Sequence, residues 1–323
     1  MEITVIIPVR NRALMLPATL DSVAAQTLRP RRLIIVDNGS DDGSPEVAAK
    51  WSAAHPDLDV VMLAEPKPGA SAARNRGLAE VSKADDSYVL FFDSDDIMLP
   101  DHIARIDKAL EARPDTDLLY FDKAFRDPDG WTTVKSTPGD GNLICHHIFH
   151  STLATASFVA RASLVERAGG WNEELLRWND YELGLRLAVE ASSPFKLTGA
   201  PRVMVLTHSE SITGCSYSKD AATLNAALDS MRRTLAAASL TQELRYLHAR
   251  RAILAGLFAR EGDAASATST MRQALDAASP RDTLAMRLAY LATRLTGRGG
   301  AAMASWLLAP PKPKRATRLS RPK

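Results

Sequence analysis

The chain has 323 residues, of which 46% are hydrophobic and 24% are charged, and its formal net charge is +2. This is the composition of a soluble globular protein with a large core, and the small net charge predicts no general attraction to nucleic acid. No stretch approaches the roughly 18 consecutive apolar residues of a membrane span. The N-terminus has no basic segment before its short apolar run, so we expect no signal peptide and a cytoplasmic protein.

The first hundred residues alternate strand and helix signals. Continuous apolar runs rich in β-branched residues predict strands buried on both faces, at Ile3–Val9, Arg32–Asp37, Asp59–Ala64 and Tyr88–Asp93. Helical spacing lies between these runs, at Leu16–Gln26, at Ser44–His55 with Ser44 as a candidate N-cap, and after Gly69. The alternation predicts an α/β fold with a mainly parallel sheet flanked by helices.

The composition changes near Lys219, where Ala-, Leu- and Arg-rich segments with helical spacing begin. We expect a first domain over 1–216, a C-terminal α-helical appendage over 217–300, and a basic, flexible tail over 301–323. From Arg281 to the end there are ten Lys and Arg residues and one acid. Such a segment can make a peripheral contact with an anionic membrane surface. Helices packed on the first domain, followed by a solubilising tail, are the alternative.

Acidic side chains gather where the predicted strands end. Asp37 closes the second strand, and Asp93 and Asp95 follow the fourth in "LFFDSDDIML". In open parallel sheets, ligands bind outside the carboxyl ends of the strands. Two carboxylates one residue apart suit a hard divalent cation that also holds phosphates and water. Since Asp-X-Asp alone is frequent by chance, a capped strand end with solvated acids is the alternative.

Six motifs occur in order along the chain, several of them at predicted strand ends or helix starts. They are "VIIPVRNR", "IIVDNGSDDGS", "PGASAARNRGL", "FFDSDD", "ERAGGWNEELLRWNDYELGLRLA" and "VMVLTHSESIT". Together they closely resemble the family 2 inverting glycosyltransferases over roughly Ile3 to Thr213. The resemblance implies the GT-A fold, which is Rossmann-like, together with a nucleoside-diphosphate-sugar donor and a Mn²⁺ or Mg²⁺ cofactor bound at a DXD motif.

The resemblance also implies roles for matching residues on the nucleotide side. Pro8 and Arg10 would line the nucleoside pocket, and Asp37 would hydrogen-bond the base. Asn38 stands where many relatives have a second aspartate, so that contact is altered. Arg74 resembles an arginine that approaches base or phosphate, and its planar fork suits either.

On the metal side, Asp93 would face ribose or metal, and Asp95 would hold the metal against the diphosphate. His208 resembles a histidine that some relatives place near the metal, although a lone histidine is more often a plain hydrogen-bonding residue. Asp42 matches a further frequent acid and would serve equally well as a turn cap.

Asp180, at the head of an amphipathic helix, is the candidate catalytic base. Composition alone favours an N-cap for Asn179 or Asp180. The resemblance reverses this preference, because relatives usually carry Glu-Asp here with the aspartate as base; Asn179 departs from that pattern. Glu182 is the fallback, but it would point elsewhere.

Three further features have two readings each. Trp171 and Trp178 could stack on a sugar or belong to the core. The run "CHHIFH" (Cys145–His150) lacks the paired spacing of structural zinc and is expected to shape the acceptor pocket.

The sequence therefore predicts a metal-dependent, inverting hexosyl- or related transferase. Uridine diphosphate is the expected nucleotide, with guanosine and deoxythymidine open, and the acceptor is a glycan, a lipid-linked molecule or another hydroxyl compound. A phosphatase of the haloacid dehalogenase type would need its Asp-X-Asp on the first strand. A sugar-nucleotide pyrophosphorylase would need a Gly-rich loop after that strand. A non-catalytic binding module derived from the same fold is the alternative that Asn38 and Asn179 favour.

Overall fold

The computed structural model describes residues 1–82, 84, 86–130, 132–135, 142–207, 216–276, 278–297 and 299–308. Two units are distinguished within the chain, Met1–Leu247 and His248–Lys323, and each is considered by itself. Among the described residues there is no helix with the length and apolarity that crossing a membrane requires.

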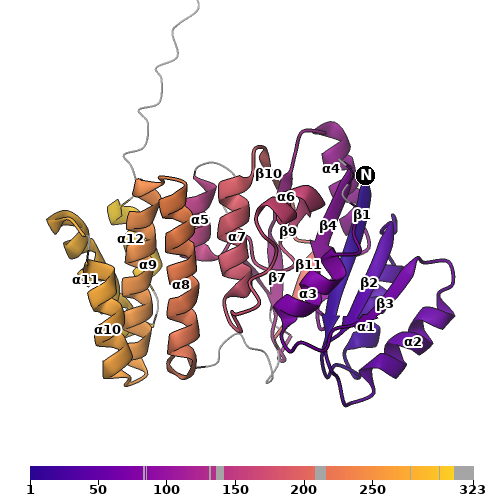
Figure 1. Cartoon of the computed structure of the whole chain (residues 1–323), viewed down its shortest axis with the longest axis horizontal. Helices are drawn as coiled ribbons and strands as arrows, with labels where there is room; N and C mark the ends of the chain where they lie inside the picture. The colour runs from indigo at the N-terminus through magenta and orange to yellow at the C-terminus, as the bar shows by residue number, and fades with distance from the viewer. Residues whose placement is uncertain are drawn as a thin grey trace, which may run out of the picture. The chain divides into compact units, whose positions relative to one another are not determined.

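The first unit is built around a mainly parallel seven-stranded sheet with the order β10-β6-β9-β4-β1-β2-β3 (Figure 1). Its strands are β1 (Glu2–Val9), β2 (Arg32–Asp37), β3 (Val60–Ala64), β4 (Ser87–Phe91), β6 (Leu118–Phe121), β9 (Phe158–Arg161) and β10 (Pro194–Leu197). β1 pairs in parallel with both β2 and β4, β2 with β3, and β6 with β10. Only β9 runs antiparallel to its neighbours in this sheet. The predicted α/β fold and the four predicted strands are confirmed.

Helices cover both faces of this sheet because successive side chains of its strands point to opposite sides. Ile3, Val5 and Ile7 of β1 face one core with α1 (Leu16–Ala24), α2 (Ser44–Ala54) and α4 (His102–Ala112). Ile6 of the same strand faces the other core with α3 (Ala70–Leu78), α6 (Ala162–Arg167) and α7 (Asn179–Glu190). A continuous apolar run is therefore required at β1, as the sequence predicts.

Helix α3 lies unusually close to the sheet at Gly77. A Cβ atom added there would come within 2.6 Å of Ile6 Cγ2 and 3.3 Å of Val36 Cγ2. Glycine therefore permits the last turn of α3 to lie directly against β1 and β2, and the rest of the helix extends from there toward the candidate site.

A second, four-stranded sheet has the order β5-β11-β7-β8 and is absent from the sequence-based expectations. Its strands are β5 (Ile97–Met98), β7 (Lys123–Arg126), β8 (Thr132–Lys135) and β11 (Val203–Leu206). β11 runs antiparallel to β5 and parallel to β7. This pairing brings the end of β11 to the residues that follow β4.

The C-terminal part is helical, as predicted. It contains the 3₁₀ turn η1 (Ser218–Asp220) and helices α8 (Ala221–Ala237), α9 (Thr241–Arg260), α10 (Ala264–Leu275), α11 (Pro280–Thr296) and α12 (Gly300–Leu308), while α5 (Leu143–His150) belongs to the first unit. Helix α8 packs on α7 within the first unit, where Ser230 Oγ donates to Glu182 Oε1 at 2.7 Å. The ranges 1–216 and 217–300 stay predictions.

The prediction of a flexible tail over 301–323 is wrong for its first part. Residues 301–308 belong to α12, because Ala304 and Leu308 are buried there and hold the helix in place. The basic run begins only after this helix, and residues 309–323 lie outside the described residues.

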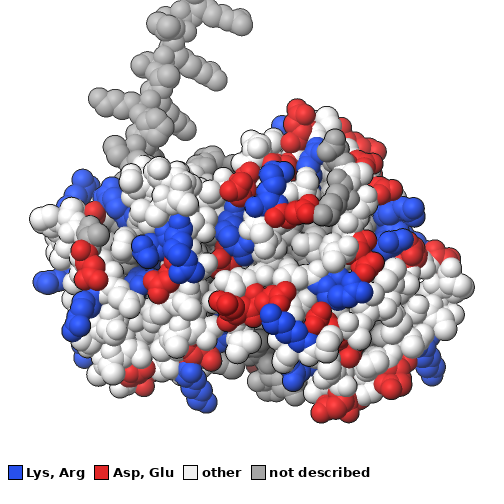
Figure 2. Space-filling view, in the orientation of Figure 1, with Lys and Arg blue, Asp and Glu red and all other residues white. Residues whose placement is uncertain are grey.

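Charged side chains of both signs are interspersed over the face seen in Figure 2. Neighbouring opposite charges cancel much of each other's field at distances beyond the Debye length of about 8 Å at physiological salt. Local arrangements of charge therefore decide what this face binds.

His102, the first residue of α4, is a buried titratable group. Its ring meets Phe121 edge-on with centroids 4.6 Å apart, and Nε2 has no hydrogen-bond partner among the described residues. Burial lowers the pKa of His102 from 6.5 to about 3, and the positive charge of Arg105 acts in the same direction.

We predict that His102 makes the fold acid-sensitive. Because its pKa is lower in the folded chain, the unfolded chain gains a proton below pH 6.5 that the folded chain does not, so stability falls as the pH drops. By pH 5 the loss is roughly 2 kcal/mol. Urea unfolding measures how far the free energy of unfolding falls between pH 7 and pH 5. This fall should be smaller by about the same amount in His102→Leu than in the wild type. An equal difference in both proteins would refute the role of His102.

Candidate functional site

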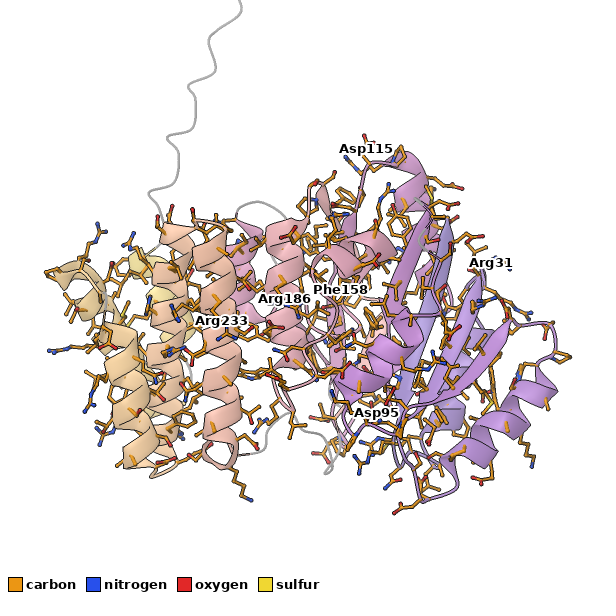
Figure 3. The ribbon with its side chains drawn as sticks, viewed as in Figure 1. Arg31, Asp95, Asp115, Phe158, Arg186 and Arg233 are labelled. Carbon is orange, nitrogen blue, oxygen red and sulfur yellow. The ribbon has the colours of Figure 1, made fainter. Side chains whose placement is uncertain are left out.

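A cavity of about 440 Å³ opens where β1, β2 and β4 end. The register pairs Val9 with Asp37 and Ile6 with Phe91, so the three strands finish at one edge of the sheet. Figure 3 shows Asp95 at this end of the strands. The cavity is lined by Pro8, Val9, Arg10, Arg12, Asn38, Gly69, Ala70, Arg74, Asp93, Ser94, Asp95, Asp96, Leu176, Val205 and Leu206. Six of the predicted site residues are among them: Pro8, Arg10, Asn38, Arg74, Asp93 and Asp95.

Arg74 and Asp93 form a largely buried ion pair in the cavity wall. Arg74 Nη2 lies 2.6 Å from Asp93 Oδ1, and the arginine side chain is only 7% exposed while that of Asp93 is 36% exposed. The guanidinium lies over the ring of Trp171, 4.3 Å from its centroid. Trp171 is itself buried and meets Phe91 edge-on at 5.1 Å. Trp171 is therefore a core residue, and its ring packs against the Arg74 guanidinium.

Arg12 forms a second ion pair across the cavity. Its Nε lies 3.3 Å from Asp95 Oδ2, and its Nη1 donates to the carbonyl of Asn11 at 2.9 Å. The sequence-based expectations named Arg10 and omitted Arg12, although both stand in "PVRNR". The signal was the second arginine of that motif, but only the fold shows that it reaches the acid motif 83 positions along the chain.

The acids of this motif strongly influence one another. Burial raises the pKa of Asp93, the positive charge of Arg74 opposes this, and the negative charge of Asp95 adds to it. Asp96 is almost fully buried and accepts the N–H of Leu206 at 3.2 Å. Burial raises its pKa well above the ordinary value, and the charge of Asp93 adds to the shift. A cation entering the cavity would relieve this crowding of negative charge.

The loop after β1 is held by the loop after β2. Asn11, with a positive φ of 52°, accepts the N–H of Asp41 at 3.0 Å, and the N–H of Ala13 donates to Asp42 at 2.9 Å. The N–H of Arg12 donates to Ser44 Oγ at 2.8 Å. These bonds fix the backbone from which Arg10 and Arg12 reach into the cavity.

Asp42 and Ser44 stabilise the turn that leads from β2 into α2. Asp42 accepts both the N–H and the hydroxyl of Ser44, and these bonds, together with the one from Ala13, lower the pKa of Asp42. The prediction of Ser44 as the N-cap of α2 is wrong, because Gly43, with φ of 84°, occupies that position. The Ser44 hydroxyl is engaged by Arg12 and Asp42 instead.

Asn38 binds the loop that leads into α3. Its Nδ2 donates to the carbonyls of Glu65 and Lys67 at 2.8 and 2.7 Å, and its Oδ1 accepts the N–H of Gly69 at 2.7 Å. An amide can do all three, whereas a carboxylate has no donor for the two carbonyls. The asparagine that departs from the aspartate of many relatives is therefore a bracket for the start of α3.

Asn75 is a second bracket, which holds the segment before α7. It donates to the carbonyl of Trp171 at 2.9 Å and accepts the N–H of the same residue at 2.8 Å. It also donates to Glu173, which pairs with Lys67. This segment carries Leu176, an exposed residue that forms part of the cavity wall.

Asp180 does not line the cavity, but its helix is tied to the cavity wall. Its Oδ1 accepts the N–H of Tyr181 at 2.8 Å and its Oδ2 accepts the N–H of Thr155 at 3.4 Å. Asn179 Nδ2 donates to Ser71 Oγ at 3.0 Å, which joins the head of α7 to the first turn of α3. The N-cap position of α7 is Trp178, so neither Asn179 nor Asp180 occupies it.

Other candidates lie in the core. Glu182 is buried in an ion pair with Arg186 at 2.6 Å and points away from the cavity, as expected. His147, from the "CHHIFH" run, is also buried; its Nδ1 accepts the N–H of Leu153 and its Nε2 lies 2.7 Å from the carbonyl of Tyr181. It therefore links α5 to α7 as a neutral imidazole. Trp178 stays partly exposed beside Tyr181.

Two predicted residues lie elsewhere. Asp37 accepts the N–H groups of Gly39 and Ser40 at 3.2 and 3.3 Å. It lines a separate small pocket, which has Val9 in common with the large cavity. Its Oδ1 is buried and has no partner among the described residues. His208 lies outside the described residues.

Comparison with known proteins defines the family. A family model described as glycosyl transferase family 2 matches residues 4–162, which hold β1 to β9 and both ion pairs of the cavity. Residues 4–162 therefore form a domain of glycosyl transferase family 2.

Several characterised or curated glycosyltransferases resemble the chain. Glycosyltransferase GlyA of Streptococcus pneumoniae is 36% identical over 109 residues, which are 34% of this chain and 15% of that protein. Glycosyltransferase AglE of Haloferax volcanii is 27% identical over 184 residues, 55% of this chain and 58% of that protein. A PGL/p-HBAD biosynthesis glycosyltransferase of Mycobacterium tuberculosis is 27% identical over 211 residues, 64% and 76% of the two chains. The chain thus spans less than two thirds of the first two relatives.

Solved structures show that the domain has the GT-A fold. Residues 1–349 of Staphylococcus aureus TarS in complex with UDP match with a TM-score of 0.62 at 14% identity, over 92% of both chains. The mannosyltransferase PcManGT of Pyrobaculum calidifontis, in complex with GDP-Man and Mn²⁺, matches with a TM-score of 0.55 at 19% identity, over 95% of this chain and 85% of that one.

The glycosyltransferase domain has donor atoms that fit a divalent ion. Among the described residues no group of three or more His, Cys, Asp or Glu side chains is arranged around one point. Two carboxylates, Asp93 and Asp95, nevertheless face the cavity. Such a pair fits Mg²⁺ or Mn²⁺, which commonly takes one or two protein carboxylates and completes its shell with phosphates and water.

We predict that Asn38→Asp destabilises this domain by about 1–3 kcal/mol, because a carboxylate would face the carbonyls of Glu65 and Lys67 and leave them without their donor. Urea unfolding at pH 7 without nucleotide measures the change. As a matched control, Asn225→Asp changes an amide that donates to the Ala221 carbonyl within its own helix, α8, and it should be much milder. Equal effects of the two substitutions would contradict the bracket role of Asn38.

Proposed function

We propose that this chain is a metal-dependent, inverting glycosyltransferase that moves a hexosyl or related sugar from a nucleoside diphosphate to an acceptor hydroxyl in glycan or polysaccharide assembly. The observation that carries the proposal is the cavity at the ends of β1, β2 and β4, lined by three aspartates and three arginines within a family 2 domain. Its volume of about 440 Å³ lies in the range of small-molecule sites. The UDP, UDP-GlcNAc and GDP-Man complexes of structures with the same fold support a nucleotide-sugar donor.

The donor diphosphate would lie between the two arginines. Arg12 and Arg74 approach the cavity from different segments, and both suit bidentate binding of phosphate oxygens. Ala70 at the N-terminus of α3 adds its backbone N–H group and the positive end of the helix dipole. Pro8, Arg10 and Asn38 would border the nucleoside, with Asp37 toward the base. We propose uracil as that base, so that the nucleoside is uridine.

Asp93 and Asp95 would hold the metal ion, and His208 is a proposed further ligand. When bound, Mn²⁺ or Mg²⁺ supplies Lewis-acid stabilisation of the departing diphosphate. The protein's own part is to keep two carboxylates at the mouth of the cavity with arginines beside them. In the absence of a donor, the two arginines therefore compensate the negative charge of the two carboxylates.

Asp180 would take the proton of the acceptor hydroxyl as the sugar is transferred. Its carboxylate is oriented by the N–H groups of Tyr181 and Thr155. One base acting in a single displacement gives inversion at the anomeric carbon, and a positioned base contributes about 10²–10⁴-fold in rate. Asn179 joins this helix to α3 through Ser71, so the departure from the Glu-Asp pattern creates a link between the two helices.

The setting of the reaction is part of the same proposal. We place the enzyme in the cytoplasm, with a glycan, a lipid-linked molecule or another hydroxyl compound as acceptor, and with the basic tail in peripheral contact with the inner membrane surface. A binding module without turnover remains the competing function, since Asn38 and Asn179 differ from the usual residues of relatives.

Nucleotide and metal binding test this function directly. Thermal unfolding with UDP, GDP or dTDP, with and without Mn²⁺, should show metal-dependent stabilisation by one nucleotide, worth about 2.7 kcal/mol at a hundred times its Kd. Asp95→Asn should lose the metal-dependent part. Asp180→Asn should keep binding but lose about 10²–10⁴-fold in hydrolysis of the matching nucleotide sugar. Binding by the wild type with no release of nucleotide would favour the binding module, and no binding of any nucleotide would refute both.

Metal affinity without nucleotide tests the Arg12 pair. Because Arg12 competes for the Asp95 carboxylate, Arg12→Ala should bind Mn²⁺ about two- to fivefold more tightly, the range expected for a partly exposed ion pair. The same variant should bind UDP more weakly in the absence of metal. Electron paramagnetic resonance of free Mn²⁺ measures the first effect and calorimetry the second. Arg10→Ala, in the same cavity wall, is the matched control. An equal rise in Mn²⁺ affinity in this variant would refute the idea that Arg12 competes with the metal for Asp95.

A further inference from the structure

Helix α11 has a buried face and an exposed face that are both apolar. Its inner side packs within the second unit through Ala285, Met286, Ala289 and Thr293. Its outer side carries four leucines at spacings of four, three and four residues, which place them on one line along the helix. These residues, here called the leucine stripe, are Leu284, Leu288, Leu291 and Leu295, with exposed fractions of 60%, 36%, 45% and 74%.

Single exposed leucines need no explanation, but an exposed row of them does. The leucine stripe also borders an open groove of about 620 Å³ between α10 and α11, which Leu291 and Tyr290 help to line. The apolar surface of α11 is therefore continuous with a concave apolar surface. Such a surface marks a place where another body binds.

Arginines run along both edges of the leucine stripe. At 100° per residue, Arg281 lies on one side of it, and Arg287 and Arg294 lie on the other. All three are exposed. The only acid between Pro280 and Thr296 is Asp282, which is buried on the inner side. All residues of this helix are described, and its outer face therefore carries leucines and arginines without a carboxylate.

The sequence that follows α11 is basic as well. Helix α12 packs on the inner side of α11, where Gly300 lies beside Ala289 and Thr293, so it leaves the leucine stripe uncovered. After Leu308 the sequence continues to Lys323 with six Lys and Arg residues and no acid.

We propose that the leucine stripe and its flanking arginines form a surface that binds anionic phospholipid, with α11 lying in the plane of the membrane interface. The leucines would enter the boundary between headgroups and acyl chains. The arginines would extend sideways along their apolar stems to the lipid phosphates. Each basic residue near such a surface raises binding by roughly fivefold, so the charged edges and the apolar centre act together.

A second copy of the chain is the competing occupant, because the same spacing occurs in coiled-coil seams. Pairing across a two-fold axis would bring each copy's arginine rows toward those of the other. With Asp282 buried, α11 offers no carboxylate to neutralise them, and the adjoining groove adds one, Asp276, against the three arginines. An anionic lipid surface supplies that negative charge, and this decides between the two occupants. The surface does not depend on the donor cavity, so it stands even if the proposed glycosyl transfer fails.

Vesicle co-sedimentation of the full chain tests the proposal. At 0.1 M NaCl the wild type should bind vesicles of 70% phosphatidylcholine and 30% phosphatidylglycerol at least about tenfold more tightly than pure phosphatidylcholine. Leu284→Glu/Leu295→Glu should lower binding to the anionic vesicles by about tenfold or more, and Arg287→Glu/Arg294→Glu should do the same. Salt at 1 M, where the Debye length is about 3 Å, should weaken the charge-dependent part.

Controls separate this surface from general effects. Leu28→Glu changes an exposed leucine of the first unit, 41% exposed, and should leave vesicle binding unaltered. Unchanged thermal unfolding and circular dichroism of the double variants would show that they fold. Brominated lipids should quench the tryptophan emission of Leu288→Trp more than that of the wild type, which reports insertion of the leucine stripe.

Two outcomes would overturn the proposal. Equal vesicle binding by the wild type and Leu284→Glu/Leu295→Glu would assign any membrane contact to the basic segment after α12 instead. A dimer in analytical ultracentrifugation that this double variant abolishes, without vesicle binding by the wild type, would make the leucine stripe a contact between copies of the chain.

Discussion

The parallel pairing of β1 with β2 and β4 positions nearly everything at the candidate site. Because the three strands run in one direction and end at one edge, the chain must leave the sheet there three times. Each exit brings polar residues to the same place: Arg10 and Arg12 after β1, Asn38 after β2, and Asp93 to Asp96 after β4. The apolar strands beneath hold these loops, because a shift of register would expose the side chains of two cores. Gly77 then lets α3 approach closely enough to add Arg74.

At this edge the electrostatic problem is one of crowded negative charge. Three aspartates lie within four residues, and burial together with repulsion from neighbouring carboxylates raises the pKa of Asp93 and of Asp96. Arg74 and Arg12 compensate two of them from segments that are remote in sequence. Those arginines also have the geometry that phosphate groups favour. In the proposed reaction the metal would replace the arginines at the aspartates, and the diphosphate would replace the aspartates at the arginines. The site would therefore need little rearrangement of its backbone.

The rigidity of that backbone comes from side-chain amides. The side chains of Asn38 and Asn75 each both donate and accept, while the Asn11 side chain accepts the N–H of Asp41. Each of the three joins segments that are remote in sequence. An amide is suited to this because it satisfies N–H and C=O groups of irregular backbone without adding charge. The C-terminal helices follow a different principle. There α11 is apolar on two sides, and only one of them is satisfied within the second unit.

Local patterns were sufficient to predict β1 to β4, the helices between them and the C-terminal helices, since each of these depends on periodicity within a short segment. The remaining strands of the large sheet, β6, β9 and β10, have only four residues each and were not predicted. Local patterns also placed Asp93 and Asp95 at a strand end, because the change from apolar to acidic residues is itself local. The small sheet of β5, β7, β8 and β11 escaped prediction, since its strands are short and pair residues as far apart as Met98 and Val203. The same holds for the Arg12–Asp95 pair, the bracket made by Asn38 and the burial of Trp171 under Arg74. These depend on distances between remote segments, which only the tertiary structure decides, because sequence spacing carries no information about them.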